Sequence, residues 1–516
     1  MNVDRRDFLT GMIGTVALST ISRDLRLTPA MAATVPTGLA TDPRRPQFHL
    51  LPAANWMNDP NGPIYWKDRY HMFYQYNPNG AFWGDMHWGH AISPDMVHWK
   101  HLSVALAPTP GDPDSEGVFS GTAVVQEDHI VMIYTGVRAS PEEQATIKDG
   151  EHVFRETQCL AVANDSALTT FTKLPQPVIA APPPAMQVSG FRDPSPWRQG
   201  DLYYMTVGSG IPHQNGTVLL YKSKDLRNWE YVHIVASGEG SKNNTANPVD
   251  SGDMWECPEL FQLGNKHVLI YSTEGKTHWQ SGDLDLKEMR FHPEQRGLLD
   301  FGSYYAAKTQ LDKHGNRIVW GWVPETRSLE EYKSAGWAGL MSLPRALTLG
   351  DDGRLRIRPS EEVNQLRGRK HSLDVTTDEA RNQRQISAMR VEGCCGEILC
   401  TSRRMSESFE FALQSADGAA TWLTVRYDKL HPDQILIQGK PHPLILGDHE
   451  DIEVHLYVDG SVIELFVNQQ IACSVRFYPA GANPQDLRMQ WIGKTTNLVS
   501  LCVWQMLPIS ADRLTT

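Results

Sequence analysis

Short apolar runs separated by polar turns recur along residues 47–350, which predicts a region built almost entirely of β-strands. In each case an apolar run meets a polar turn and is followed by a second run rich in β-branched and aromatic residues. We expect each pair of runs to form an antiparallel hairpin. The pairs are 62–66 with 70–76, 122–125 with 130–134, 194–197 with 202–207, 259–261 with 267–271, and 304–307 with 317–322.

A short segment that begins with Asp, here called the Asp marker, recurs between these hairpins. Asp95-Met-Val-His-Trp99 and Asp225-Leu-Arg-Asn-Trp229 match closely. Asp165 and Asp285 begin weaker copies, so the four Asp residues fall 70, 60 and 60 positions apart. A repeat of this length made only of strands is typical of sheets arranged radially. We therefore predict a five-bladed β-propeller over residues 47–350; the alternative, a non-repeating β-sandwich, explains neither repeat.

The pattern changes after about residue 370. A plain hairpin spans residues 453–467 and turns at Asp459-Gly460. Further strand-like runs lie at 421–427, 434–438 and 487–492. Short strands with polar turns and without the propeller repeat predict a separate β-sandwich over residues 370–516. The overall fold class is therefore all-β, a propeller followed by a sandwich.

Two segments are expected to link the folded parts. Residues 33–46 precede the first predicted strand and are expected to be a linker. The charged stretch 351–369 is the expected connector between propeller and sandwich. A short helix is expected at Ser360–Arg367, because Ser360 followed by two Glu residues can cap and charge a first helical turn.

The first 32 residues have the features of an export signal. Arg5-Arg6 forms a twin-arginine pattern, a mildly apolar stretch covers 11–21, and Ala30-Met-Ala32 is a small-x-small cleavage site. The apolar stretch is too short to span a bilayer, which takes about 20 residues. We expect a Tat-type signal at residues 1–32 and an exported, periplasmic or extracellular protein.

Composition and charge exclude several classes. The 516 residues are 41% hydrophobic and 21% charged, with 40 Gly and 33 Pro, unlike a disordered, collagen-like or coiled-coil chain. The net charge of −12 is a poor match for nucleic acid or an anionic membrane, so a neutral substrate is expected. Seven scattered cysteines indicate neither a disulfide framework nor a zinc site. No metal or organic cofactor is expected.

Polar motifs open the first four hairpins. They are Trp56-Met-Asn-Asp-Pro-Asn-Gly62, Phe119-Ser-Gly121, Phe191-Arg-Asp-Pro194 and Trp255-Glu-Cys-Pro258. The first strand of each propeller blade lines the central axis, so we expect Asp59, Asp193 and Glu256 to converge at the same point of the repeat.

Convergent carboxylates in an aromatic cleft indicate either a metal site or sugar chemistry. Calcium takes six to eight oxygens, usually from one local loop, and the sequence has no such loop. His87 and His90 lack a third ligand, so a structural role is expected for both. Aromatic walls with carboxylates suit a sugar ring. The tryptophans expected to rim the cleft are Trp56, Trp83, Trp255, Trp320 and Trp337.

Taken together, these motifs resemble family 32 of the glycoside hydrolases, which contains invertases, inulinases, levanases and fructan exohydrolases. The resemblance includes Trp83-Gly-Asp-Met-His-Trp-Gly-His90, the segment 300–308 (DFGSYYAAK) and the segment 336–345 (GWAGLMSLPR). It implies a β-fructofuranosidase acting on sucrose or on fructans such as levan and inulin, and the signal expected at residues 1–32 makes this an exported enzyme. It also implies Asp59 as the nucleophile, Glu256 as the general acid/base and Asp193 as the residue that stabilises the transition state. The substrate contacts that it implies are Asn58, Gln75, Trp83, Ser120, Arg192 and Trp322.

These roles require opposite charge states of two acids. A retaining enzyme needs an ionised carboxylate under the anomeric carbon and a protonated acid at the leaving oxygen, about 5–5.5 Å apart. Asn58 and Arg192 adjoin Asp59 and Asp193 and are expected to favour their ionised forms. Glu256 lies between Trp255 and Cys257, an apolar setting expected to raise its pKa, and Cys257 is expected to tune it.

Three other functions remain open at this point. A fructosyltransferase would use the same residues with a sugar acceptor in place of water. A fructan-binding protein without activity would not need the three intact acids. An inverting arabinan-degrading propeller would hold its carboxyl groups beyond about 6.5 Å. The preference among sucrose, inulin and levan depends on loops and is left open, as are the role of the sandwich, the oligomeric state and protein partners.

Overall fold

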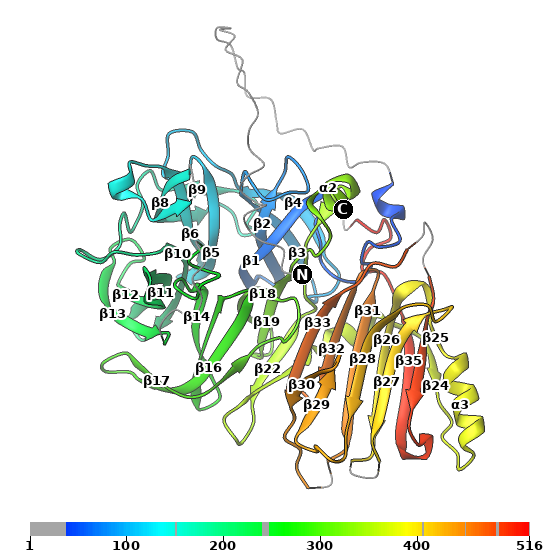
Figure 1. Cartoon of the computed structure of the whole chain (residues 1–516). Coiled ribbons are helices and arrows are strands. Elements are labelled where there is room, and N and C mark those ends of the chain that lie inside the picture. Colours follow the sequence, from blue (N-terminus) through cyan, green and yellow to red (C-terminus); the bar gives the residue numbers. More distant parts are fainter. Residues whose placement is uncertain are drawn as a thin grey trace.

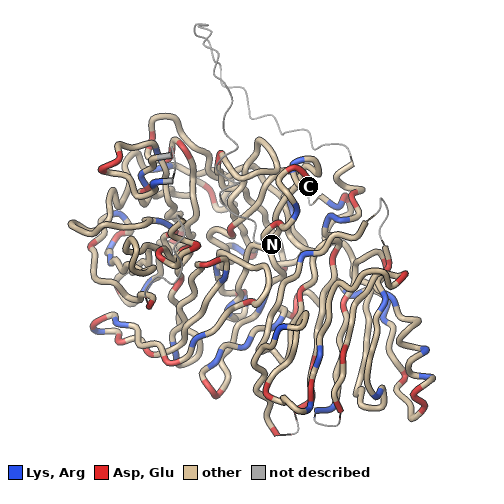
Figure 2. Tube along the Cα trace, viewed as in Figure 1, with Lys and Arg blue, Asp and Glu red and all other residues tan. Residues whose placement is uncertain are grey.

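The computed structural model describes residues 38–149, 152–239, 247–404, 407–448, 450–480 and 485–514. The twin-arginine segment lies outside the described residues. Within these ranges the chain forms two all-β bodies, a propeller and a sandwich, which lie side by side (Figure 1). Acidic and basic residues are interspersed over both bodies (Figure 2). No helix of the described ranges is long and apolar enough to cross a bilayer.

In the described residues the propeller has five blades, each numbered by its order along the chain. Blade one is β1 (Asn55–Trp66), β2 (Arg69–Asn77), β3 (His87–Ser93) and β4 (Lys100–Leu106). Blade two is β5 (Gly117–Gln126), β6 (His129–Ala139), β8 (His152–Ala163) and β7 (Ile147–Asp149), with β9 (Phe171–Lys173) also on β8. Blade three is β10 (Phe191–Gln199), β11 (Leu202–Ile211), β12 (Asn215–Ser223) and β13 (Glu230–Ser237). Blade four is β14 (Glu256–Leu263), β15 (Lys266–Thr273), β16 (Lys276–Asp285) and β17 (Arg290–Leu298). Blade five is β18 (Tyr305–Leu311), β19 (Arg317–Val323), β22 (Arg345–Leu349) and β23 (Leu355–Pro359), with β21 (Leu340–Met341) on β19.

The first strands of the blades form a closed ring around the axis. β1 contacts β5, β5 contacts β10, β10 contacts β14, β14 contacts β18, and β18 returns to β1. The ring is also fastened by β20 (Trp337–Ala338), which pairs in parallel with the start of β1. Apolar side chains fill the spaces between adjacent blades: one buried cluster joins Val131 of β6 to Val207 of β11, and the next joins Val218 of β12 to Leu269 of β15. This confirms the predicted five-bladed propeller.

The recurring Asp marker forms the turn that follows the third strand of a blade. Asp95 Oδ1 accepts hydrogen bonds from the N–H groups of Val97 and His98, and Asp225 Oδ1 does the same for Arg227 and Asn228. These bonds let the side chain replace backbone pairing in a tight turn. Asp165 and Asp285 make the equivalent contacts, as does Asp352 in the fifth blade, which the sequence analysis missed.

The sandwich consists of two sheets with an apolar layer between them. One sheet is β24 (Arg367–Ser372), β35 (Leu498–Met506), β26 (Cys395–Ser402), β31 (Ile452–Asp459), β32 (Val462–Val467) and β33 (Ile471–Arg476). The other is β25 (Arg390–Val391), β34 (Leu487–Ile492), β27 (Phe409–Ser415), β28 (Thr421–Tyr427), β29 (Gln434–Ile437) and β30 (Lys440–Pro443). The predicted hairpin and the three predicted strand runs are confirmed.

Two α-helices were not predicted, although both carry a start signal. α2 (Leu329–Ala335) begins with a capping box in which Ser328 and Glu331 exchange side-chain to backbone hydrogen bonds. α3 (Glu379–Ala388) begins at Asp378, whose side chain accepts from the N–H of Arg381. Short 3₁₀ turns lie at η1 (Leu39–Thr41), η2 (Glu142–Gln144), η3 (Glu361–Leu366), η4 (Glu392–Cys394) and η5 (Thr495–Asn497).

The two segments expected as links are integrated into the fold. The helix expected at Ser360–Arg367 is the 3₁₀ helix η3, and the Ser360 hydroxyl bonds to the Glu362 carboxylate instead of a backbone N–H. The stretch 351–369 also contains β23 and the start of β24, so it is not a connector alone. Residues 38–46 are not a free linker either, because the Arg45 side chain is fully buried and donates to the carbonyl of Pro52.

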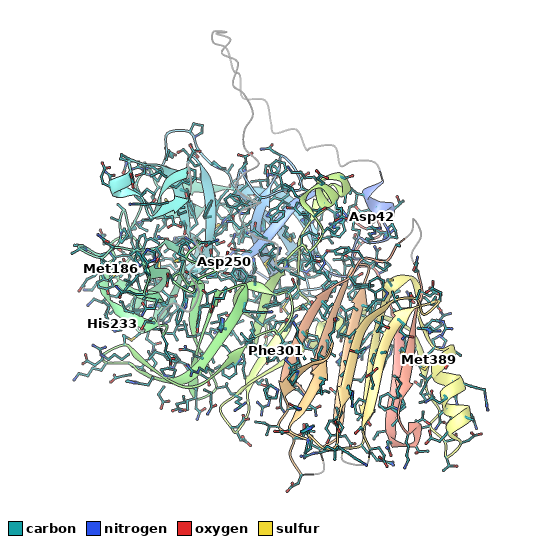
Figure 3. The ribbon with its side chains drawn as sticks, viewed as in Figure 1. Asp42, Met186, His233, Asp250, Phe301 and Met389 are labelled. Atoms are coloured by element: carbon teal, nitrogen blue, oxygen red, sulfur yellow. The ribbon has the colours of Figure 1, made fainter. Side chains whose placement is uncertain are left out.

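A buried ionic cluster ties the propeller to the sandwich beside Phe301, which lies at the junction (Figure 3). Arg345 of β22 donates to Asp300 Oδ2 at 2.8 Å and to Glu464 Oε2 of β32 at 2.7 Å. The Ser474 hydroxyl contacts both Arg345 and Asp300. His49 bridges Asp459 and Glu464. Burial lowers the pKa of His49, but its hydrogen bonds to these two carboxylates outweigh burial and raise the pKa to about 9.

Breaking this cluster is expected to destabilise the whole molecule. Arg345→Leu leaves two buried carboxylates without their cation, so the free energy of unfolding should fall by about 3–5 kcal/mol. Urea denaturation monitored by tryptophan fluorescence measures the change. The matched control is Arg356→Leu, which removes a partly exposed ion pair with Asp352 and should cost less than about 1 kcal/mol. An equal loss in the two variants would show that the cluster does not join the domains.

Candidate active site

The acidic residues lie where the inner strands of the propeller bulge. Pairing between the first and second strands slips between Met57 and Pro60 in blade one, Phe119 and Gly121 in blade two, and Arg192 and Ser195 in blade three. The same slip occurs between Glu256 and Glu259, and between Tyr305 and Lys308. A bulge redirects a side chain out of the normal alternation of a strand. The bulge is repeated in all five blades, so it turns one polar group after another toward the residues at the same position of the neighbouring inner strands.

Register shows which residues are equivalent. Arg192, Glu256 and Tyr305 each directly precede the bulge in blades three, four and five. The residues that follow them, Asp193, Cys257 and Ala306, have positive φ angles of 65°, 49° and 54°. The prediction that Asp193 and Glu256 occupy the same point of the repeat is therefore wrong by one position, because Asp193 corresponds to Cys257.

Asp59 is held from three sides. The Ser120 hydroxyl donates to Asp59 Oδ2 at 2.6 Å, and Asn58 Nδ2 donates to Asp59 Oδ1 at 3.0 Å. The Cys257 thiol lies 3.7 Å from Asp59 Oδ2. Donors of this kind stabilise a charged carboxylate and fix its direction. Asp59 is half-buried, so the residue keeps some contact with solvent.

Asp193 adjoins Asp59 through Cys257. The Cys257 N–H donates to Asp193 Oδ2 at 2.9 Å, and the thiol of the same residue lies 3.6 Å from that oxygen. The Asp193 N–H donates to the hydroxyl of Thr135 at 2.9 Å. Cys257 therefore contacts Asp59 and Asp193, rather than tuning Glu256 as expected.

The charge state of Asp193 differs from the prediction. Burial raises its pKa to about 7, the nearby Arg192 lowers it, and the charges of Glu256 and Asp59 raise it further. Arg192 does act in the predicted direction, but desolvation and two neighbouring carboxylates outweigh it. Glu256 and Asp59 therefore both lie close enough to Asp193 to change its pKa.

Glu256 is bound by polar groups on both oxygens. Arg192 donates to Glu256 Oε1 through Nε at 3.1 Å and through Nη2 at 2.9 Å, and the Tyr305 hydroxyl donates to Oε2 at 2.6 Å. The predicted apolar setting is wrong, because the flanking side chains lie elsewhere. Trp255 stacks on Tyr271 with ring centroids 3.7 Å apart, and Cys257 faces the two aspartates.

The remaining predicted substrate contacts fall into two groups. Ser120 and Asn58 touch Asp59, as described above, and Asn58 also accepts a hydrogen bond from the Trp56 indole at 2.7 Å. Trp83 and Trp322 are half-buried, and Trp322 packs edge-on against Trp56 at 5.8 Å. Gln75 is buried and donates to the carbonyl of Val118 at 2.9 Å, so its amide fastens blade one to blade two.

Most of the tryptophans expected at the rim are buried instead. Trp56 and Trp337 are fully buried, and Trp320 and Trp255 are nearly so. Trp320 packs against Trp99 at 5.6 Å, and Trp337 lies under the guanidinium of Arg327. The rim prediction is wrong for these four, and of the five only Trp83 keeps a partly exposed ring.

Other polar groups have structural partners. His90 Nε2 lies 3.0 Å from His71 Nδ1 between strands β2 and β3, and His87 bonds to the carbonyl of Asp85. Among the residues that the structure describes, no group of His, Cys, Asp and Glu side chains is arranged to hold a metal ion.

Two residues that contact the site were missed by the sequence analysis. Tyr305 could have been found from the repeat, because it occupies the same register position as Arg192 and Glu256. Glu156 of β8 lies outside every motif identified in the sequence. Its Oε1 nevertheless accepts a hydrogen bond from Arg192 Nη1 at 2.8 Å. No local sequence signal identifies it, because its role depends on the neighbouring blade.

Acids that cluster on the inner strands of a propeller and differ in their hydrogen-bond partners are typical of enzymes that cleave glycosidic bonds. The chain belongs to family 32 of the glycosyl hydrolases: the N-terminal domain of that family matches residues 49–359, and the C-terminal domain matches residues 362–505. It is therefore a glycoside hydrolase.

Known proteins resemble the chain over most of its length. It is 34% identical over 461 residues to sucrose-6-phosphate hydrolase of Escherichia coli, covering 84% of this chain and 89% of that protein. It is 32% identical over 474 residues to raffinose invertase of E. coli, covering 85% and 90%. Among solved structures, a family 32 β-fructofuranosidase of Bombyx mori has a TM-score of 0.72 at 29% identity, covering 91% of this chain and 96% of that one.

Proposed function

We propose that the protein is a retaining β-fructofuranosidase that hydrolyses terminal β-D-fructofuranosyl residues of sucrose and fructans. The observation that carries the proposal is the pairing of two differently held acids. Asp59 accepts hydrogen bonds from the neutral donors Ser120 and Asn58, whereas Glu256 is held by Arg192 and Tyr305. The names of the relatives, sucrose-6-phosphate hydrolase, raffinose invertase and β-fructofuranosidase, support the same substrate class.

In the first step Asp59 is the nucleophile. Its carboxylate oxygen bonds to C2 of the fructosyl ring while the bond from C2 to the glycosidic oxygen breaks. Glu256 transfers its proton to that oxygen, so the leaving sugar departs as a neutral alcohol. Ser120 and Asn58 orient the Asp59 carboxylate toward the ring.

In the second step water replaces the leaving sugar. Glu256, now a carboxylate, removes a proton from the water, whose oxygen bonds to C2 as the bond to Asp59 breaks. Arg192 and Tyr305 stabilise the charge of Glu256 in this half of the cycle. Fructose leaves with its original anomeric configuration, and both acids regain their starting states.

Asp193 is the proposed transition-state stabiliser. Its carboxyl group lies beside both reacting acids through the contacts of Cys257. A carboxyl group in this position suits the ring hydroxyls of fructose, whose hydrogen bonds strengthen as positive charge develops on the ring. Its pKa of about 7 makes its ability to accept such bonds dependent on pH near neutrality.

Export is a further part of the proposal. It rests on the twin-arginine pattern and the small-x-small site within residues 1–32. Fractionation of the producing cells, with Arg5-Arg6→Lys-Lys as the comparison, tests this part alone.

Product analysis tests the proposed reaction. With sucrose we expect free fructose and free glucose in equal amounts, and ¹H NMR during the first turnovers should show β-fructofuranose before mutarotation. A deficit of fructose with longer oligosaccharides would instead identify the transferase. An initial α anomer would contradict retention, and binding without products would identify the non-catalytic alternative. Parallel assays on inulin, levan and sucrose 6-phosphate measure the preference.

A further inference from the structure

Glu156 is a fully buried carboxylate that the proposed reaction does not use. It lies on β8, the third strand in the sheet of blade two, away from the strands that carry the site motifs. Its two oxygens have different partners: Oε1 accepts from Arg192 Nη1 at 2.8 Å, and Oε2 accepts from the N–H of Phe191 at 2.6 Å. A buried charge is retained only with such compensation.

The contacts place Glu156 behind Arg192. Nη1 of the Arg192 guanidinium faces Glu156, while Nη2 and Nε face Glu256. Gly190 makes this arrangement possible, since a Cβ at that position would lie 2.7 Å from Arg192 Nη1. The cation therefore bridges two carboxylates from different blades, the fully buried Glu156 and the slightly exposed Glu256.

The bridge has an electrostatic consequence. Burial lowers the pKa of Arg192, but Glu156, Glu256 and Asp193 outweigh it, in that order, and raise the pKa well above its ordinary value. Arg192 therefore remains charged, and an unshared cation at hydrogen-bond distance would strongly favour the carboxylate form of Glu256. A general acid must instead hold a proton when substrate binds. Glu156 supplies a negative charge that neutralises part of the cation.

We propose that Glu156 is a positioning residue that divides the charge of Arg192 between two carboxylates, and thereby keeps Glu256 able to hold the proton it donates. The inference rests on the proposed function, because it takes Glu256 as the acid. It adds to the site a fourth acidic residue that touches no substrate and acts through Arg192.

Other charged and titratable groups also face this region. Asp59 and Asp193 add negative charge, and the thiol of Cys257 lies between them. Lys308 of β18 is buried and close enough to lower the pKa of Cys257, although burial raises that pKa overall. Tyr305 donates to Glu256 Oε2. Arg192 Nη1 donates to Glu156, so the Glu156 substitution removes one negative charge at that atom.

The test is the pH dependence of kcat/KM for sucrose in Glu156→Gln. The alkaline limb reports loss of the proton from the acid in the free enzyme. Removing the negative charge of Glu156 both ends its repulsion of Glu256 and frees Arg192, and both effects stabilise ionised Glu256. We therefore expect the alkaline limb to move to lower pH by about one unit. The acidic limb should move less.

Gln158→Leu is the matched control. Gln158 Nε2 donates to the carbonyl of Phe191 at 2.9 Å, so this neutral side chain fastens the same backbone from the same strand. Its loss is expected to lower kcat without moving the alkaline limb. Glu156→Asp keeps the negative charge but places it farther from Arg192. It should shift the alkaline limb to lower pH by about half a pH unit. This variant provides the test if Glu156→Gln does not fold.

Each outcome is decisive. An unmoved limb in the folded Glu156 variant, or a limb moved to higher pH, overturns the inference. An equal shift in Gln158→Leu would assign the effect to the backbone instead of the charge. Glu256→Ala separates the two proposals: if that variant keeps the alkaline limb, the proposed role of Glu256 fails, whereas loss of the limb together with an unmoved Glu156→Gln profile defeats only the present inference.

Discussion

Replacing Asp59 by alanine is expected to abolish sucrose turnover, with kcat/KM reduced about 10⁵-fold or more. The substitution removes the only group that can form a bond to C2 in the proposed two-step reaction. The site keeps Glu256, Arg192 and Tyr305, so substrate protonation alone would remain. Initial rates from sucrose at high enzyme concentration measure the loss.

The fold should survive this substitution. Asp59 is half-buried, and it bonds to the side chains of Asn58 on β1, Ser120 on β5 and Cys257 on β14. Circular dichroism and the thermal midpoint are therefore expected to stay near those of the unmodified enzyme. Glu116→Ala is the matched control: it removes an exposed acid just before β5 and should change activity by less than roughly twofold. Activity of Asp59→Ala close to that of the control would defeat the assignment.

Replacing Glu256 by alanine is expected to have a large effect that depends on the leaving group. With sucrose, loss of acid assistance should reduce kcat/KM by about 10³- to 10⁴-fold. With a β-fructofuranosyl fluoride, whose leaving group needs no proton, Asp59 should still attack, and the fructosyl-enzyme should accumulate because no base activates water. A burst of fluoride followed by slow turnover is the expected time course.

Azide provides the control within the same variant. It attacks without a general base, so it should restore fluoride release by Glu256→Ala and give a fructosyl azide with the β configuration. With Asp59→Ala, azide should give no product of retained β configuration, because that variant forms no fructosyl-enzyme intermediate. A retained azide product from Asp59→Ala, or equal losses on sucrose and the fluoride for Glu256→Ala, would contradict the assigned roles.

Features decided by local chemistry could be predicted from the sequence. The hairpins follow from alternating apolar and polar residues, and each Asp marker follows from a side chain that bonds to nearby N–H groups in a turn. Convergence of Asp59 and Ser120 follows from their places on neighbouring inner strands, and the two side chains do meet at 2.6 Å. α2 and α3 were overlooked despite capping residues at Ser328 and Asp378.

Features that depend on strand register and on neighbouring blades could not be predicted from the sequence. The bulges shift Arg192 onto Glu256 and leave Asp193 beside Cys257, although the sequence places Arg192 next to Asp193. Burial of Trp320 and Trp337 depends on which face of a strand they occupy and what covers it. These differences reverse the expected environments of Asp193 and Glu256 without moving either one out of the site.

Identification of the covalent intermediate tests the central claim most directly. Glu256→Ala would be mixed with β-fructofuranosyl fluoride, quenched in acid within the burst, digested and analysed by tandem mass spectrometry. If Asp59 is the nucleophile, one peptide, spanning Asp59, should carry a single fructosyl group in ester linkage to that side chain. A label on another residue, or a burst of fluoride that leaves every peptide unmodified, would contradict it.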